Sequence, residues 1–271
     1  MTTLFIGGGN MAAAMIGGLI GRGIPGADLH VVELRAEARE DLRQRFGVNA
    51  HAAPDAACTV CDAIVLAVKP QQMREVARQI APHLGSQLVV SIAAGIRLGD
   101  LARWLGGYSR LVRVMPNTPA LIGAGISGLH ALPAVDATGR AQAEAILQAV
   151  GNTFWVDDEA RMDSVTAVTG SGPAYVFMFI EALQSGALAM GFDPATAHRM
   201  AVDTVLGAAR LAESSSDSPA ELRVKVTSKG GTTEAALAVM QQRAVVDGIV
   251  AGMRAAEARG RELGELLGRE S

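Results

Sequence analysis

The sequence predicts an α/β domain with a mostly parallel, doubly wound sheet, followed by an all-helical domain. The chain has 271 residues, 49% of them hydrophobic and 19% charged, which is enough for about two domains with buried cores. Its first half alternates short β-rich runs with amphipathic segments, the pattern of a parallel sheet covered by helices on both faces. After Asp157, apolar residues recur at helical spacing only.

The expected elements follow from these runs. Strands are expected where β-branched and other apolar residues cluster, at 4–7, 29–33, 63–68, 88–92, 110–115 and 153–156. Helices are expected between them, where apolar residues recur three or four positions apart, at 11–21, 36–46, 71–84 and 137–150. The second half is expected to hold long helices at 176–190, 195–211 and 244–267. We place the domain boundary near residue 158, with domains at 1–158 and 159–271.

Composition and charge narrow the range of partners. The chain has 24 basic and 27 acidic residues, a net charge of -3, and no basic patch that would favour nucleic acid or an anionic membrane. The uncharged N-terminal stretch before Arg22 is interrupted by glycines, so it predicts neither a membrane span nor a signal peptide. We therefore expect a small-molecule partner and a cytoplasmic location.

Cys58 and Cys61 match the C-x-x-C spacing of a redox pair. They come just before an apolar strand rather than opening a helix, which favours a role other than redox chemistry and leaves their function open. Two cysteines and five scattered histidines do not form a ligand cluster, so no metal is expected.

A glycine signature lies between the first strand and the first helix. Residues 7–12, Gly-Gly-Gly-Asn-Met-Ala, fit the pattern G-x-G-x-x-G/A. Gly7 allows a tight turn, Gly9 lets a pyrophosphate approach the backbone, and Ala12 keeps helix and strand close. The free N–H groups and the positive dipole end of the helix favour phosphate binding. The first domain is therefore predicted to bind a dinucleotide.

Two residues after the second strand give opposite indications about the cofactor. Glu33 is placed where an acid accepts a hydrogen bond from the 2'-hydroxyl of NAD, whereas Arg35 could contact a 2'-phosphate. A carboxylate pointing into the pocket would repel that phosphate, but a Glu33 that turned outward would leave Arg35 available. The sequence therefore leaves open whether the cofactor is NADPH or NADH.

A nicotinamide cofactor implies hydride transfer, and the sequence offers no strong acid or base for an alcohol oxidation. Tyr108 and Tyr175 are not followed four residues later by lysine, and no lysine occurs between Lys69 and Lys225, where a β-hydroxyacid dehydrogenase would carry one. A substrate that already carries its proton, such as an iminium ion, would not need such a group.

Three further segments are too rich in small and turn-forming residues to serve packing alone. They are Met-Pro-Asn-Thr-Pro at 115–119, Thr-Gly-Ser-Gly-Pro-Ala at 169–174 and Thr-Ser-Lys-Gly-Gly-Thr-Thr at 227–233. The last of these ends in a glycine pair that opens a helix, whose N–H groups suit an anion such as a carboxylate. The chain resembles the pyrroline-5-carboxylate reductases from about residue 4 to residue 267. The resemblance rests on these segments and the glycine signature, together with Val-Lys-Pro-Gln at 68–71 and Ser-Ile-Ala-Ala-Gly at 91–95.

The resemblance implies a Rossmann domain, a helical dimerisation domain that interlocks with a second subunit, and reduction of L-1-pyrroline-5-carboxylate to L-proline in the last step of proline biosynthesis. It implies a homodimer and leaves open whether dimers assemble further, for example into a decamer. Alternatives remain open: a reductase of another cyclic imine, a β-hydroxyacid dehydrogenase relative, and a non-catalytic dinucleotide-binding redox sensor.

The resemblance also assigns roles to residues of both domains. The cofactor would be bound by Gly7, Gly9, Asn10, Met11, Ala67, Lys69, Pro70, Ala93 and Asn117. Arg35 is added to these cofactor residues because of its position after the second strand. The substrate would be bound by Gly230, Gly231, Thr232 and Ser171, and the catalytic Thr233 hydroxyl would reach the ring nitrogen. The chain departs from many relatives at Pro54 and Glu33, both near the expected adenosine ribose, so its cofactor preference is not implied by the resemblance.

Overall fold

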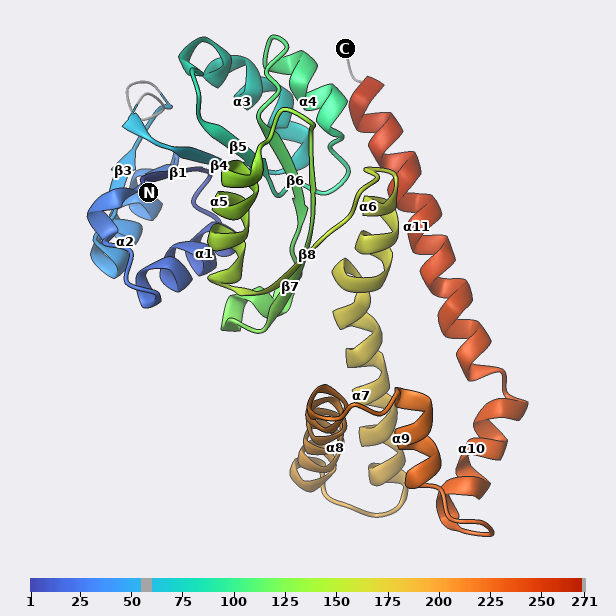
Figure 1. Cartoon of the computed structure of the whole chain (residues 1–271). Helices are drawn as coiled ribbons and strands as arrows, with labels where there is room; N and C mark the ends of the chain where they lie inside the picture. Colours follow the sequence, from blue (N-terminus) through green and yellow to red (C-terminus); the bar gives the residue numbers. More distant parts are fainter. Residues whose placement is uncertain (55–59, 270–271) are drawn as a thin grey trace. The chain divides into compact units, whose positions relative to one another are not determined.

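The computed structural model describes residues 1–54 and 60–269. An eight-stranded sheet with the order β3-β2-β1-β4-β5-β6-β7-β8 forms the centre of its N-terminal part (Figure 1). The strands are β1 (Thr3–Ile6), β2 (Leu29–Val32), β3 (Asn49–His51), β4 (Ala63–Leu66), β5 (Leu88–Ser91), β6 (Leu111–Met115), β7 (Gly125–Ala131) and β8 (Gly151–Trp155). Neighbouring strands pair in parallel, except for the antiparallel pair β6 and β7. The predicted mostly parallel sheet is confirmed.

The sequence analysis missed β3 and β7. β3 is a short edge strand, and β7 reads Gly-Ile-Ser-Gly-Leu-His-Ala, a composition with low strand propensity. Close packing explains the glycine that opens β7, because a Cβ on Gly125 would lie 2.9 Å from the Val150 carbonyl oxygen. A Cβ on Gly151 would lie only 1.9 Å from the Gly125 oxygen. These glycines let β7 and β8 approach each other, a tertiary requirement that local sequence patterns do not reveal.

The strand order reverses between β1 and β4. From β1 the chain moves outward to β2 and β3 on one side, and from β4 it moves outward through β5 and β6 on the other. At such a switch point the loops leave in opposite directions and open a crevice at the carboxyl ends of the strands, where ligands bind in open α/β sheets. Gly7 follows β1 and Ala67 follows β4, so both lie at this point.

Helices cover both faces of the sheet. Side chains alternate along β1, so Phe5 joins the hydrophobic cluster beneath α1 and α5, while Leu4 and Ile6 join the cluster beneath α3 and α4. This burial on both faces explains the continuous apolar runs of the strands. The helices of this part are α1 (Asn10–Gly21), α2 (Ala36–Phe46), α3 (Met73–Ile80), α4 (Leu98–Trp104), α5 (Ala137–Gln148) and α6 (Arg161–Val165).

The chain divides into two compact units. The first unit comprises residues 1–171 and 256–271, and the second comprises residues 172–255. Between residues 156 and 269 the structure contains only helices and turns, as the sequence predicts. The helices are α7 (Gly172–Ala189), α8 (Pro194–Ser214), α9 (Pro219–Lys225), α10 (Thr232–Gln242) and α11 (Val245–Arg269). The domain boundary expected near residue 158 stays a prediction, because the two units are defined by packing within a single chain and do not by themselves define domains.

The end of α11 packs in the first unit. A Cβ on Gly264 would lie 3.2 Å from the Gly95 carbonyl oxygen, and the Leu267 side chain joins the hydrophobic cluster beneath α3 and α4. The Glu257 carboxylate accepts a hydrogen bond from the Ser164 hydroxyl. The last turns of the chain thus support the loop that follows β5.

The second unit buries few large side chains. Its buried residues on α7 and α8 are the alanines Ala187, Ala197 and Ala201, so these helices meet through small residues. Many apolar side chains of this unit are exposed in the single chain, among them Val176, Phe177, Met178, Phe179, Val239, Met240, Val246 and Val250. Among the described residues, none of the helices combines the length and the apolar character needed to cross a bilayer.

α9 was also missed by the sequence analysis. Ser218 and Glu221 form a capping box around its first turn, and Pro219 occupies the first helical position. The Ser-Pro-Ala-Glu sequence carries this signal, which would have predicted the helix start.

Candidate active site

The glycine turn after β1 adopts a conformation that requires glycine. Gly7 has φ of +102°, and a Cβ there would lie 2.8 Å from the Ala67 carbonyl oxygen. The Gly7 N–H donates to the Val32 oxygen at 2.8 Å, and the Ala67 N–H donates to the Ile6 oxygen at 2.9 Å. These hydrogen bonds tie the ends of β1, β2 and β4 together at the switch point.

The N-terminus of α1 fits a pyrophosphate. α1 begins at Asn10, and Gly9 precedes it in an extended conformation. Within the described part of the chain, no side chain caps this helix, and a Cβ on Gly9 would meet no atom within 4 Å. The first-turn amides, those of Asn10 and Met11 among them, therefore have no capping side chain from the described residues, which suits the phosphates of a dinucleotide.

The Glu33 carboxylate faces the glycine turn. Its Oε2 accepts a hydrogen bond from the Gly8 N–H at 3.3 Å, and its Oε1 accepts from the Arg35 N–H at 3.0 Å and from Arg35 Nε at 3.2 Å. The Glu33 side chain is 12% exposed, whereas that of Arg35 is 76% exposed. Burial alone would raise the pKa of Glu33, but the hydrogen bonds from Arg35 and Gly8 and the Arg35 charge outweigh it, so this pKa lies below its usual range.

The residues after β4 begin beside the glycine turn, where the Ala67 carbonyl oxygen lies next to Gly7. Ala67 is half-buried, and Lys69 is exposed and precedes a 3-10 turn (Pro70–Gln72). Pro70 fits the first position of this turn because its missing N–H is not needed there. The Lys69 oxygen accepts from the Gln72 N–H at 2.9 Å, which closes the turn.

Ala93 and Asn117 follow the carboxyl ends of β5 and β6. Ala93 is buried, and its N–H is 3.4 Å from the Ser91 hydroxyl oxygen. The Asn117 side-chain amide is also buried, donating to the Thr169 oxygen at 3.1 Å and accepting from the Ile126 N–H at 3.0 Å. Asn117 therefore joins the loop after β6 to β7 and to the π-helical turn (Thr166–Gly170). Both residues lie at the edge of the sheet where ligands bind.

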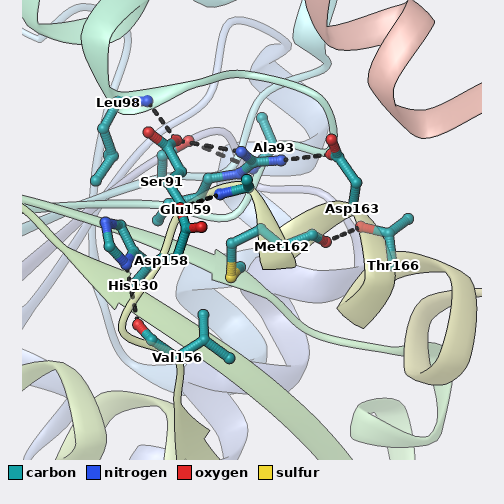
Figure 2. A network of polar contacts seen from close by, with 12 residues as sticks. Ser91, Ala93, Leu98, His130, Val156, Asp158, Glu159, Met162, Asp163 and Thr166 are labelled. Carbon is teal, nitrogen blue, oxygen red and sulfur yellow. Dashed lines mark hydrogen bonds and ion pairs between the residues drawn. The ribbon is translucent and has the colours of Figure 1, made fainter. Parts of the chain in front are cut away.

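Figure 2 shows a network of polar contacts that contains a largely buried ion-pair cluster. Arg113 of β6 is 4% exposed, with Nη1 3.1 Å from Glu159 Oε1 and Nη2 3.5 Å from Asp163 Oδ1. The same Glu159 oxygen accepts from the Leu98 N–H at 2.7 Å, at the start of α4. The network therefore connects β6, α4 and α6. The sequence analysis did not single out these residues, although an arginine inside a buried strand is a signal that could have done so.

The predicted substrate residues divide between the units. Ser171 lies in the first unit, where its N–H donates to the Thr166 oxygen at 2.8 Å. Gly230, Gly231, Thr232 and Thr233 lie in the second unit, at the start of α10.

Two of the amides predicted to bind the substrate carboxylate already have partners. The Gly230 N–H donates to Glu234 Oε2 at 2.6 Å, and the Gly231 N–H donates to the Ser228 oxygen at 3.0 Å. Gly230 has φ of +70°, and Gly231 precedes α10 in an extended conformation. Within the described residues no side chain caps this helix, and Thr233 is partly buried in its first turn. The Glu234 carboxylate is thus hydrogen-bonded to the Gly230 amide, which was predicted to bind the substrate carboxylate.

Two other predictions concern cysteines and metal. Cys58 lies outside the described residues, so the C-x-x-C interpretation stays a prediction, and Cys61 is buried at 7% exposure. Among residues 1–54 and 60–269, the structure brings together no group of three or more His, Cys, Asp or Glu side chains that could hold a metal ion.

Comparison with known proteins gives matches over nearly the whole chain. Family models match residues 159–263, described as pyrroline-5-carboxylate reductase dimerisation, and residues 2–95, described as NADP oxidoreductase, coenzyme F420-dependent. The first range contains the whole second unit, which supports a homo-oligomer. Pyrroline-5-carboxylate reductases from Pseudomonas aeruginosa and Vibrio alginolyticus are 45% and 40% identical, each over 97% of both chains.

Solved structures agree with the sequence matches. A pyrroline-5-carboxylate reductase from Coxiella burnetii superimposes with a TM-score of 0.93 at 38% identity, over 97% of this chain and 98% of that one. A pyrroline carboxylate reductase from Plasmodium falciparum, solved with NADP bound, has a TM-score of 0.86 at 27% identity, with the same coverage. The chain therefore belongs to the pyrroline-5-carboxylate reductase family and is an NAD(P)H-dependent oxidoreductase.

Proposed function

We propose that the chain reduces L-1-pyrroline-5-carboxylate to L-proline with NADPH or NADH, in the last step of proline biosynthesis and in the cytoplasm. The observation that carries this proposal is the match to relatives named for this activity over 97% of the chain. The glycine turn at the switch point supports it independently, because its geometry suits a dinucleotide.

The first unit would bind the cofactor. The turn at Gly7 and Gly9 and the amides of Asn10 and Met11 would hold the pyrophosphate. Arg35 would lie near the adenosine ribose, Ala67, Lys69 and Pro70 would line the crevice, and Ala93 and Asn117 would border the nicotinamide. When bound, the reduced nicotinamide supplies a hydride to the carbon of the protonated C=N bond.

The second unit would bind and orient the substrate. The amides of Gly230, Gly231 and Thr232 would hold its carboxylate, with Glu234 leaving the Gly230 amide as the substrate arrives. The Thr233 hydroxyl would contact the ring nitrogen, and Ser171 would border the same site. The iminium nitrogen already carries its proton, so these residues act mainly by positioning, an effect that contributes up to about 7–11 kcal/mol in well-oriented reactions.

The proposed enzyme is a homodimer that can assemble further, to a decamer for example. Exposed apolar side chains on α7, α10 and α11 support an interface between chains, since exposed apolar surface is typical of protein interfaces. A partner chain that covered them would complete the core that the second unit lacks by itself.

A direct assay tests the proposed reaction. Purified protein is mixed with pyrroline-5-carboxylate and either NADPH or NADH, loss of the reduced-nicotinamide absorbance is followed, and proline is quantified. We expect consumption of cofactor and formation of proline in equal amounts. Cofactor binding without consumption would instead support the redox-sensor alternative.

A further inference from the structure

The Glu33 side chain is fixed where the adenosine ribose of a dinucleotide would lie. β2 ends at Val32, so Glu33 is the first residue beyond the carboxyl end of the strand next to β1. Its N–H donates to the His51 oxygen at 3.1 Å, and its own carbonyl oxygen accepts from Arg39 Nη1 at 2.8 Å. In a dinucleotide-binding sheet, an acidic residue at this position accepts a hydrogen bond from a ribose hydroxyl.

The carboxylate also points inward, toward the glycine turn. A Cβ built on Gly8 would lie 3.3 Å from Glu33 Oε2 and 2.7 Å from Leu42 Cδ1, so the side chain packs against the turn itself. The hydrogen bond from the Gly8 N–H holds it there. Of the two orientations that the sequence left open for Glu33, the structure has the inward one.

The guanidinium groups of Arg35 and Arg39 do not replace the Glu33 carboxylate beside the glycine turn. Arg35 Nε is bound to the Glu33 carboxylate at 3.2 Å, and the rest of its side chain is largely exposed. Arg39 Nη1 donates to the carbonyl oxygens of Glu33 and Leu34, each at 2.8 Å. Both guanidinium groups therefore make contacts within the turn between β2 and α2, and the carboxylate is the group that lies against the glycine turn.

We propose that Glu33 sets the cofactor preference of this enzyme, and that the preference is for NADH over NADPH. The Glu33 carboxylate would accept a hydrogen bond from the ribose 2'-hydroxyl of NADH and would repel the 2'-phosphate of NADPH. This inference rests on the proposed function, because it requires a dinucleotide in the glycine turn.

Equilibrium binding tests the proposal without turnover. Dissociation constants for NADH and NADPH are measured by titration calorimetry for wild type, for Glu33→Gln and for Glu75→Gln. Glu75 is an exposed carboxylate on α3, so its substitution makes the same change in net charge away from the ribose site. Thermal unfolding of each variant shows that it is folded.

We expect wild type to bind NADH at least about tenfold more tightly than NADPH. Glu33→Gln should strengthen NADPH binding by roughly tenfold, and Glu75→Gln should leave the ratio of the two constants unchanged. The proposal is overturned if wild type binds NADPH as tightly as NADH or more tightly. It is also overturned if Glu33→Gln does not change the ratio of the two dissociation constants. In either case the proposed reductase function stands. If wild type binds neither cofactor, the proposed function fails as well.

Discussion

Arg113 and Glu159, which are 46 residues apart in the sequence, form an ion pair with Nη1 and Oε1 3.1 Å apart. Arg113 belongs to β6, the strand that leads into the loop containing Asn117. Glu159 also accepts the hydrogen bond from the Leu98 N–H, and Asp163 binds the other arm of the guanidinium. One buried arginine therefore joins the strand, α4 and the helical segment that leads to Ser171.

Replacing Arg113 by methionine is expected to destabilise the protein strongly. The substitution leaves the carboxylates of Glu159 and Asp163 with little solvent and without their cation, and breaking a buried ion pair in this way costs about 3–5 kcal/mol. Chemical unfolding of the full chain, monitored by circular dichroism, measures this loss.

The exposed Arg259–Glu262 pair offers a matched control. Its atoms are 2.8 Å apart and both side chains are more than 60% exposed, at 63% and 64%. Arg259→Met should therefore change stability by less than about 1 kcal/mol. Equal losses for the two variants would show that the buried network has no special role.

The pH dependence of stability is expected to reveal the Glu33 contacts. The pKa of Glu33 is lowered in the folded chain, so the carboxylate stabilises the fold at pH values above about 4.3, where unfolded glutamate is ionised. This contribution is lost as the pH falls through the lower folded pKa. The difference in melting temperature between wild type and Glu33→Gln should consequently shrink as the pH falls below about 4.3.

Glu75→Gln again serves as the control, because Glu75 binds only Gln79 in the described structure, at 3.3 Å. A Glu33→Gln curve that runs parallel to wild type would contradict the assigned contacts.

Much of the fold could be predicted because its signals are local. The helix at 36–46 was predicted with its observed bounds, and the glycine turn was predicted from residues 7–12. The Arg113 network could not be assembled from the sequence, because its partners lie on segments that meet only after the sheet has formed. The orientation of Glu33 was likewise left open, since it depends on packing against Gly8 and Leu42. The substrate and catalytic roles of residues 230–233 stay predictions.

Thr233→Ala is expected to reduce kcat/KM for pyrroline-5-carboxylate by roughly 10- to 150-fold. The variant loses one hydrogen bond near a charged group, worth about 1.5–3 kcal/mol. Steady-state kinetics with the reduced cofactor at saturation measures the effect. Thr233→Ser keeps the hydroxyl and should retain most of the activity, whereas an alanine variant with wild-type kinetics would exclude the proposed role.

Glu234→Ala is expected to lower the KM for pyrroline-5-carboxylate. The Glu234 carboxylate accepts the Gly230 N–H at 2.6 Å, so it competes with the substrate carboxylate for the same donor. A net hydrogen bond contributes about 0.5–1.5 kcal/mol, so removing the competitor should lower KM by roughly 2- to 13-fold. Glu213→Ala, which removes an exposed carboxylate at the end of α8, should leave KM unchanged. An increase in KM for Glu234→Ala would show that Glu234 supports the anion site instead of competing for it. Inhibition by acetate or another small carboxylate, measured on both variants, shows whether the change in KM lies in carboxylate binding.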